Sequence, residues 1–260
     1  MADFNNYQNR MAQTRAQSDA MIDQGLRSYM LKVYNLMAVG LGITGVAAYG
    51  ISALATTTDT AAAVAQLPNG ILLTALGAAI YGSPLRWVVM LAPLAVVFFL
   101  SFRVHKMSVG AAQATFWGYA ALMGLSLSSI FIVYTAESIV QTFFITAASF
   151  GALSLYGYTT KKDLSGMGSF LIMGLFGLII ASIVNIFLAS SALGWAISVI
   201  GVLIFAGLTA YDTQKIKEMY FDGDDVVVAG RKAIMGALTL YLDFINLFTF
   251  LLQFLGNRND

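Results

Sequence analysis

The sequence contains no cysteine, so it offers neither a disulfide framework nor thiol redox chemistry. It has a single histidine, His105, which leaves too few nitrogen ligands for a zinc or haem site, and we expect no bound cofactor. Charged residues are also scarce, at 10% of the chain, and the net charge is only +1. A charge balance this close to zero gives no reason to expect nucleic acid or another polyanion as a partner.

The sequence is rich in apolar residues. They make up 58% of the 260 residues, whereas soluble domains average about 45–50% apolar and about 25% charged residues. This composition predicts an all-α polytopic membrane protein, with the lipid bilayer as its first partner. Residues 1–30 are polar, mixed in charge and without the pattern of a signal peptide, so they predict a cytoplasmic tail ahead of a transmembrane domain over residues 31–260.

Seven segments are long and apolar enough to cross a bilayer, which requires about 20 residues per helix. They are approximately Val33–Leu54, Trp87–Phe102, Val109–Tyr134, Ile139–Tyr158, Ser169–Leu188, Trp195–Tyr211 and Ala233–Leu255. The segment Ile71–Tyr81 is bracketed by proline and glycine turns and is too short to span. We therefore expect it to be an interfacial or re-entrant piece.

The distribution of basic residues predicts the orientation. With seven spans and a cytoplasmic N-terminus, 12 of the 14 Lys and Arg residues lie inside and only Arg86 and Arg258 lie outside. Counting Ile71–Tyr81 as an eighth span would instead place most of them outside. Because Lys and Arg in short loops favour the cytoplasmic side, seven spans with an external C-terminus are predicted.

Two acids stand in or beside the apolar spans. Asp243 lies about 15 Å from one end of its span and about 18 Å from the other, close to the middle of the membrane. An acid there costs about 2.5–3.5 kcal/mol on the translocon scale, so such residues face the bundle interior or a watery cavity. Asp212 ends the preceding span near the cytoplasmic boundary. The two acids are then offset by about 8 Å along the membrane normal, and contact between them requires a tilted or broken helix.

Such a pair has three possible chemistries. The carboxyl groups can share one proton and titrate as a unit. They can contact a hard cation such as Ca²⁺, which prefers six to eight oxygen ligands, so two carboxylates make a weak and transient site. They can also form an aspartyl dyad that activates water.

The dyad interpretation rests on Tyr211-Asp212 and a second Asp on the next span, an arrangement similar to presenilin-type intramembrane proteases. The similarity is incomplete, because Leu240-Tyr241-Leu242 precedes Asp243 where those enzymes have Gly-x-Gly. Their late Pro-Ala-Leu element is also missing, since the three prolines are Pro68, Pro84 and Pro93.

Two long motifs resemble the bacterial branch of the Bax inhibitor (TMBIM) family of membrane proteins. They are SLYGYTTKKDLSGMGSFLIMGLFGLIIASIVNIFL, residues 154–188, and GLTAYDTQKIKEMY, residues 207–220. The resemblance extends from about Met30 to Leu255. It implies seven helices with the last helix central in the bundle, in a bacterial inner (plasma) membrane.

For function, the resemblance implies a pH-sensitive calcium leak that is not an enzyme. Asp212 and Asp243 match the family's aspartate pair, which would sense pH, gate the pathway and bind Ca²⁺ weakly, and Arg103 matches a basic residue that would latch the pair. The alternative is a non-transporting regulator that binds a membrane-bound quality-control protease, a role in which the acid pair would be structural.

Overall fold

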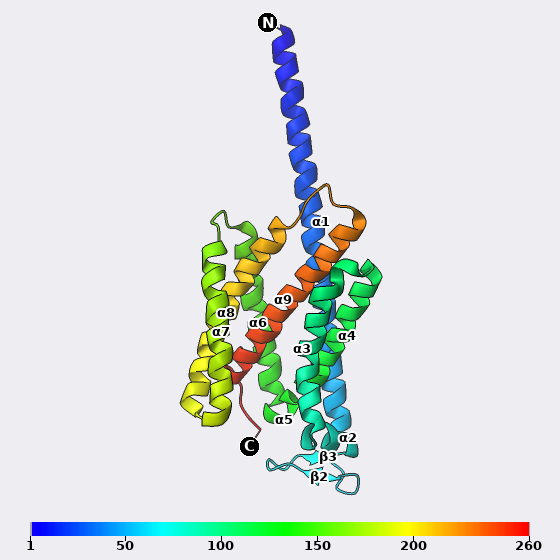
Figure 1. Ribbon diagram of the computed structural model, residues 1–260, viewed down its shortest axis with the longest axis vertical. Helices are drawn as coiled ribbons and strands as arrows, with labels where there is room; N and C mark the ends of the chain where they lie inside the picture. The colour runs from blue at the N-terminus through cyan, green and yellow to red at the C-terminus, as the bar shows by residue number, and fades with distance from the viewer. Residues whose placement is uncertain (1, 260) are drawn as a thin grey trace.

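The computed structural model describes the backbone of residues 2–259 and the side chains of residues 23–259. The bounds of the longer helices are α1 Ala2–Ala55, α3 Leu85–Arg103, α4 Val109–Leu127, α6 Ala136–Thr159, α7 Ser165–Leu188, α8 Ser191–Glu218 and α9 Val226–Leu255. The shorter elements are β1 Thr56–Thr57, β2 Ala65–Gln66, β3 Leu72–Leu73, α2 Ala75–Gly77, a single π-type turn Ala78–Gly82, a 3₁₀ turn Val104–Lys106 and α5 Ile130–Val133. The protein is therefore an almost entirely helical bundle (Figure 1).

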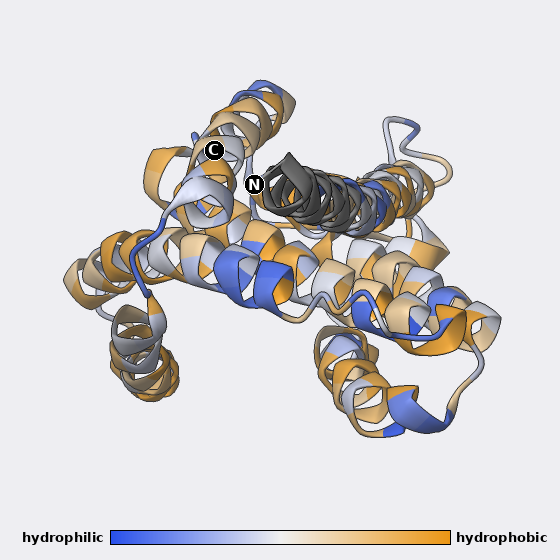
Figure 2. Cartoon of the chain, turned by 90° about the horizontal axis from the view of Figure 1, so that it is seen from above, coloured by the Kyte–Doolittle hydropathy of each residue, from blue (hydrophilic) through white to orange (hydrophobic). Residues whose placement is uncertain are grey.

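Seven helical segments of the described chain are long and apolar enough to cross a membrane, which confirms the predicted number. Hydrophobic residues dominate the outside of the bundle, and hydrophilic residues gather at its turns (Figure 2). The first of these segments is the described part of α1, Asp23–Ala55, and it belongs to one continuous helix. The side chains of residues 1–22 lie outside the described part, so the predicted character of the tail is not tested there.

Side-chain caps determine where several helices begin. Ser108, Thr135, Ser190 and Asp225 each precede a helix, and each side-chain oxygen accepts a hydrogen bond from the backbone N–H three residues later. These bonds satisfy N–H groups that a helix start leaves without partners. Before α7 the acceptor lies only two residues ahead of the donor, because Ser165 N–H donates to the carboxylate of Asp163 (2.8 Å). The hydrogen bonds from Ser165 hold the pKa of Asp163 below its usual range.

The last helix is the centre of the bundle, as predicted. Two thirds (67%) of the most apolar window of α9 is buried, against 6% for α7. It contacts α1, α4, α6 and α8, and it runs diagonally across the other helices (Figure 1). The helices thus form one layer around a tilted central helix.

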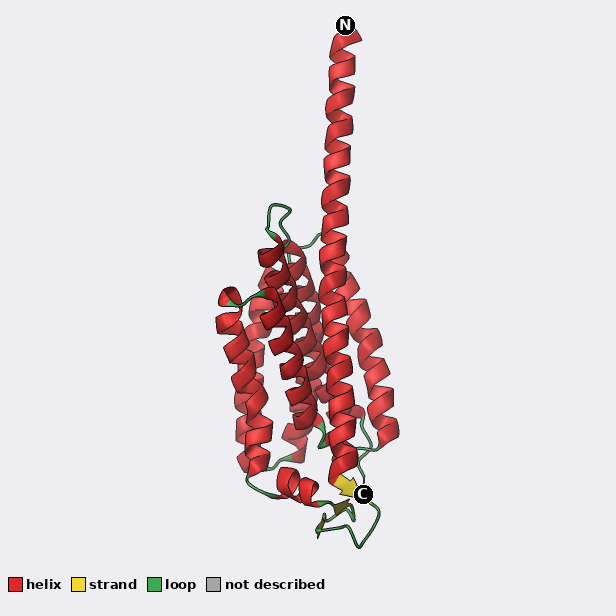
Figure 3. Ribbon diagram, turned by 90° about the vertical axis from the view of Figure 1, so that its right-hand side faces the viewer, coloured by secondary structure: helices red, strands yellow, loops and turns green. Residues whose placement is uncertain are grey.

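The two ends of the bundle differ in structure. The loop between α8 and α9 lies at the end from which the N-terminal part of α1 emerges, and we call this the N-terminal end (Figure 1). The C-terminus and the three-stranded sheet, with strand order β1-β3-β2, lie together at the opposite end (Figure 3). An odd number of spans therefore separates the termini, while the absolute orientation in the membrane stays a prediction.

The segment Ile71–Tyr81 does not cross the bundle. It contributes β3 and α2 and part of the π-type turn, next to the end of α1, and Thr74 bonds to the backbone of Leu54 and Ala55. Tyr81 OH lies 2.8 Å from Ser128 Oγ, at the point where α4 ends. The predicted single span Val109–Tyr134 is thus interrupted after Leu127, and the interfacial piece is bonded to that interruption.

The C-terminal residues are attached to the same end. Thr135 N–H donates to the carbonyl of Asn257 (3.0 Å) and Asn259 N–H donates to the carbonyl of Val133 (2.9 Å). Asn259 Nδ2 also donates to the carbonyl of Tyr134 (3.1 Å). The end of α9 is therefore fixed to the connection between α5 and α6.

Candidate functional site

The antiparallel helices α8 and α9 bring the two predicted acids together. Asp212 lies inside α8, which continues to Glu218 and does not end near Tyr211 as the sequence suggested. Asp243 lies in the middle part of α9, which begins at Val226, seven residues earlier than predicted. The tilt of α9 (Figure 1) removes the offset expected for upright helices, and the carboxyl groups of Asp212 and Asp243 lie close enough to interact directly.

The pair is largely withdrawn from solvent and lipid. Asp243 is only 4% exposed. Among the described residues, its Oδ2 atom has no hydrogen-bond partner apart from what the neighbouring carboxyl group can supply. A hydrogen bond between two carboxyl groups requires a proton on one of them. Two carboxyl groups this close can therefore share one proton between α8 and α9.

Two glycines let the neighbouring helices approach α8 beside Asp212. A Cβ atom on Gly157 of α6 would lie 2.1 Å from the backbone oxygen of Ala210. A Cβ atom on Gly168 of α7 would lie 2.5 Å from the ring of Tyr211. Since no side chain fits at either position, α6 and α7 pack directly against the turn of α8 that carries Asp212.

A chain of hydroxyl groups runs beside this turn and links three helices. Tyr34 OH of α1 lies 2.6 Å from Ser154 Oγ of α6, which lies 2.9 Å from Thr213 Oγ1 of α8. Thr213 Oγ1 donates to the carbonyl of Thr209 (2.7 Å). The chain ends at a backbone carbonyl, so it serves to fix α1 and α6 against the helix turn next to Asp212.

The basic residues around the pair are not placed as the resemblance implies. Lys215, three residues beyond Asp212 on α8, is the cation whose charge acts on that carboxyl group. Arg103 is exposed at the end of α3. The one ion pair among the side chains of residues 23–259 joins Lys232 to Asp224, so Arg103 does not contact the acids in this arrangement. Its role as a latch stays a prediction.

The loop between α8 and α9 closes the N-terminal end of the bundle. Lys232 binds Asp224 and also donates to the carbonyl of Met219 (3.0 Å). The rings of Tyr29 and Tyr220 lie 5.7 Å apart, which ties the loop to α1. These contacts hold the two helices that carry the acids at their common end.

The acid pair is a poor resident site for a metal ion. No cluster of three or more His, Cys, Asp or Glu side chains suited to a metal occurs in the described part of the chain. The two carboxylates supply at most four oxygens, whereas Ca²⁺ takes six to eight. The pair alone does not form a complete coordination shell for such a cation.

Some polar residues that join neighbouring segments by hydrogen bonds were not predicted from the sequence. Gln214 is buried, accepts a hydrogen bond from Leu164 N–H (2.8 Å) and donates to the carbonyl of Lys162 (2.8 Å). The hydroxyl oxygens of Thr44 in α1 and Tyr241 in α9 lie 2.6 Å apart and are hydrogen-bonded. Only Lys215 had a usable signal, its i+3 spacing from Asp212 on a helix.

The fold and the site together define a class: seven-helix membrane proteins with two neighbouring acids on the last two helices. A family model described as "Inhibitor of apoptosis-promoting Bax1" matches residues 26–260. The chain therefore belongs to the Bax inhibitor family, as the two sequence motifs indicated.

Relatives agree with this assignment over nearly their whole length. The inner membrane protein YbhL of Escherichia coli (strain K12) is 48% identical over 247 residues, which cover 93% of this chain and 97% of YbhL. An uncharacterized protein of Caulobacter vibrioides is 46% identical over 263 residues, covering all of both chains. The protein RP147 of Rickettsia prowazekii is 47% identical over 247 residues, 95% of this chain and 97% of RP147. None of the three bears the name of an enzyme, and this chain is a multi-pass protein of the inner membrane.

Proposed function

We propose that the protein is a pH-dependent leak pathway for cations, with Ca²⁺ as the transported ion, and that the Asp212–Asp243 pair is its proton-sensitive element. The observation that carries this proposal is that the two carboxyl groups lie against each other at a position where Asp243 is almost fully buried. Lone structural acids in a bundle bond to donors, whereas here each acid is the partner of the other.

The physical basis is a change of charge at a helix contact. With one shared proton the pair carries a single negative charge, and gain or loss of a proton changes that charge by one unit. Two ionised carboxylates at hydrogen-bonding distance repel each other strongly in a site with little water. A pH change therefore biases two arrangements of α8 and α9, provided that the arrangements differ in proton affinity.

The described arrangement fits the closed form of such a pathway. Around Asp243, the side chains of Leu240, Tyr241 and Leu247 are at most 1% exposed. A hydrated ion cannot pass through a contact this well packed, so flux requires α8 and α9 to separate. The acids would then face the path and their oxygens would be available to a passing cation.

Ca²⁺ flux measured against pH in liposomes that contain only the purified protein tests the proposal. Asp212→Asn and Asp243→Asn each remove the shared titration but keep a polar group of similar size, so each should flatten the dependence of flux on pH. Asp222→Asn, an exposed acid of the α8–α9 loop, is the matched control and should behave as the wild type. Folded Asp→Asn variants that retain the wild-type curve would contradict the proposal.

A regulator of a membrane-bound protease is the second candidate, and α7 is the observation that favours it. This helix is the least buried span, and its Phe170, Phe176 and Phe187 are each more than 60% exposed. A regulator needs its partner, whereas a leak does not. Absence of flux in liposomes of the purified wild type at every pH would therefore favour the regulator.

We further propose that the pair does not catalyse peptide hydrolysis, although a carboxyl dyad that shares a proton is also the arrangement of aspartic proteases. The purified protein should leave transmembrane peptides intact at every pH. Specific cleavage that both Asp212→Asn and Asp243→Asn abolish would overturn this part of the proposal.

A further inference from the structure

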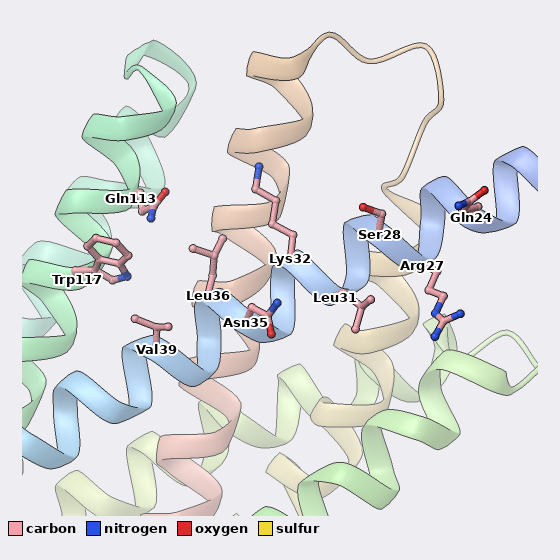
Figure 4. Close-up of a pocket in the computed structure, with 10 residues that line it drawn as sticks. All are labelled: Gln24, Arg27, Ser28, Leu31, Lys32, Asn35, Leu36, Val39, Gln113 and Trp117. Carbon is pink, nitrogen blue, oxygen red and sulfur yellow. The ribbon is translucent and has the colours of Figure 1, made fainter.

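A groove of about 680 Å³ lies along α1 and faces α4 (Figure 4), and neither acid of the pair lines it. Its lining runs along α1 from Gln24 to Val39 and includes Gln113 and Trp117 of α4. The fifteen helical steps from Gln24 to Val39 correspond to about 22 Å of helix, at about 1.5 Å per residue. The groove therefore extends from the N-terminal end of the bundle into the apolar part of the span.

The lining changes from basic to apolar along this length. Arg27 and Lys32 lie near its N-terminal end, together with the uncharged polar side chains of Gln24, Ser28 and Asn35. Leu36, Val39 and the indole of Trp117 lie at the deeper end (Figure 4). The change follows the depth that a phospholipid would occupy, with its headgroup at the surface and its acyl chain below.

Among the described side chains, none neutralises the two cations of the groove. No acidic residue lines the groove, and neither Arg27 nor Lys32 takes part in an ion pair among the side chains of residues 23–259. In Figure 4 Arg27 and Lys32 leave α1 on opposite sides of Ser28 and Leu31 and point in opposite directions across the helix, so a negatively charged group over this part of the helix would have one cation on either side. The chemistry of the groove is thus that of a receptor for an anion with an apolar tail.

We infer that this groove binds one anionic phospholipid. Its phosphate lies between Arg27 and Lys32, and one acyl chain lies along α1 against Val39 and Trp117. Juxtamembrane Lys and Arg residues attract acidic lipids, and both side chains can reach the headgroup while their aliphatic parts cover α1. This inference concerns a surface separate from the acid pair and does not depend on the proposed leak.

The chain carries a reporter for this site. Trp117 lines the groove, while the other two tryptophans, Trp87 and Trp195, lie at the starts of α3 and α8, at the opposite end of the bundle. The experiment uses the full chain with Trp87→Phe and Trp195→Phe, reconstituted in phosphatidylcholine vesicles. Quenching of Trp117 is measured as brominated phosphatidylglycerol or, separately, brominated phosphatidylcholine replaces part of the lipid.

We expect brominated phosphatidylglycerol to quench Trp117 at roughly tenfold lower mole fraction than brominated phosphatidylcholine, because two cations face the headgroup. The double variant Arg27→Gln/Lys32→Gln should remove this preference, and Arg27→Lys/Lys32→Arg should retain it. Lys161→Gln/Lys162→Gln, which removes two exposed cations from the α6–α7 loop, is the charge-matched control and should retain it as well.

Three outcomes would overturn the inference. Equal quenching by the two lipids would show that the headgroup is not recognised. An unchanged preference in Arg27→Gln/Lys32→Gln would place recognition elsewhere. Absence of quenching by either lipid would show that the groove is covered by something else, such as a second copy of the chain.

Discussion

At the scale of single residues, the unusual feature is that each acid of the pair depends on the other. A buried carboxyl group costs free energy unless it is hydrogen-bonded. In this bundle the group that can satisfy the buried carboxyl group of Asp243 is the carboxyl group of Asp212, on the neighbouring helix, and not a backbone donor. A substitution at one acid therefore changes the chemistry of the other, which is why the two positions have to be tested together.

Gln214 provides a residue-scale prediction about stability. Gln214→Leu would leave the backbone N–H of Leu164 and the carbonyl of Lys162 without their partners, and an unpaired buried polar group costs about 1–3 kcal/mol. We expect a loss of roughly 2 kcal/mol or more, seen as a lower Tm in detergent. Gln141→Leu, the same change at an exposed position of α6, should leave Tm almost unchanged. Equal Tm values for both variants would contradict the role assigned to Gln214.

At the scale of helices, composition and length were sufficient to predict the seven spans, since each needs only a sufficient run of apolar residues. The helix ends were less predictable. Both α8 and α9 extend about two turns beyond the apolar runs, because the cap at Asp225 and the contact between Lys232 and Asp224 stabilise polar helical turns outside them. The break of α4 after Leu127 lies beside the bond between Tyr81 and Ser128, which is a tertiary contact.

The contact between Asp212 and Asp243 could not be predicted from the sequence either. Counting about 1.5 Å per residue assumes helices that stand upright, and it left Asp212 and Asp243 apart. The tilt of α9 is set by packing against four neighbouring helices, which no local pattern records. The sequence identified the two acids because an acidic side chain inside a membrane costs free energy. It did not predict that the two side chains touch.

The close approach of α6 to α8 provides an element-scale prediction. Gly157→Ala would force a methyl group into the backbone of Ala210, and a backbone atom cannot move without shifting its helix. Overpacking typically costs about 1–3 kcal/mol, so we expect a clear fall in Tm. Gly151→Ala, on the same helix but with no atom within 4 Å of the added carbon, should be neutral or stabilising because alanine favours helix. A reversed order of the two Tm values would contradict the packing of this interface.

At the scale of the whole molecule, the bundle places its two chain ends on opposite sides and most of its basic residues at the N-terminal end. The absence of cysteine makes the orientation simple to measure. Single cysteines at Asp222 and Asp59, which are exposed at opposite ends, would be treated with an impermeant thiol reagent in intact cells. The basic-residue distribution predicts labelling of Asp59→Cys and protection of Asp222→Cys. Labelling in the opposite pattern would reverse the assigned orientation.

The central claim is that Asp212 and Asp243 act as one proton-sensitive unit, and a double-mutant cycle tests it most directly. Ca²⁺ flux against pH would be measured in liposomes for the wild type, Asp212→Asn, Asp243→Asn and the double variant. Once either acid is replaced, no shared titration remains, so the double variant should give the same flattened curve as each single variant. Single variants that each retain part of the pH dependence, with effects that add in the double variant, would show two independent groups and contradict the account.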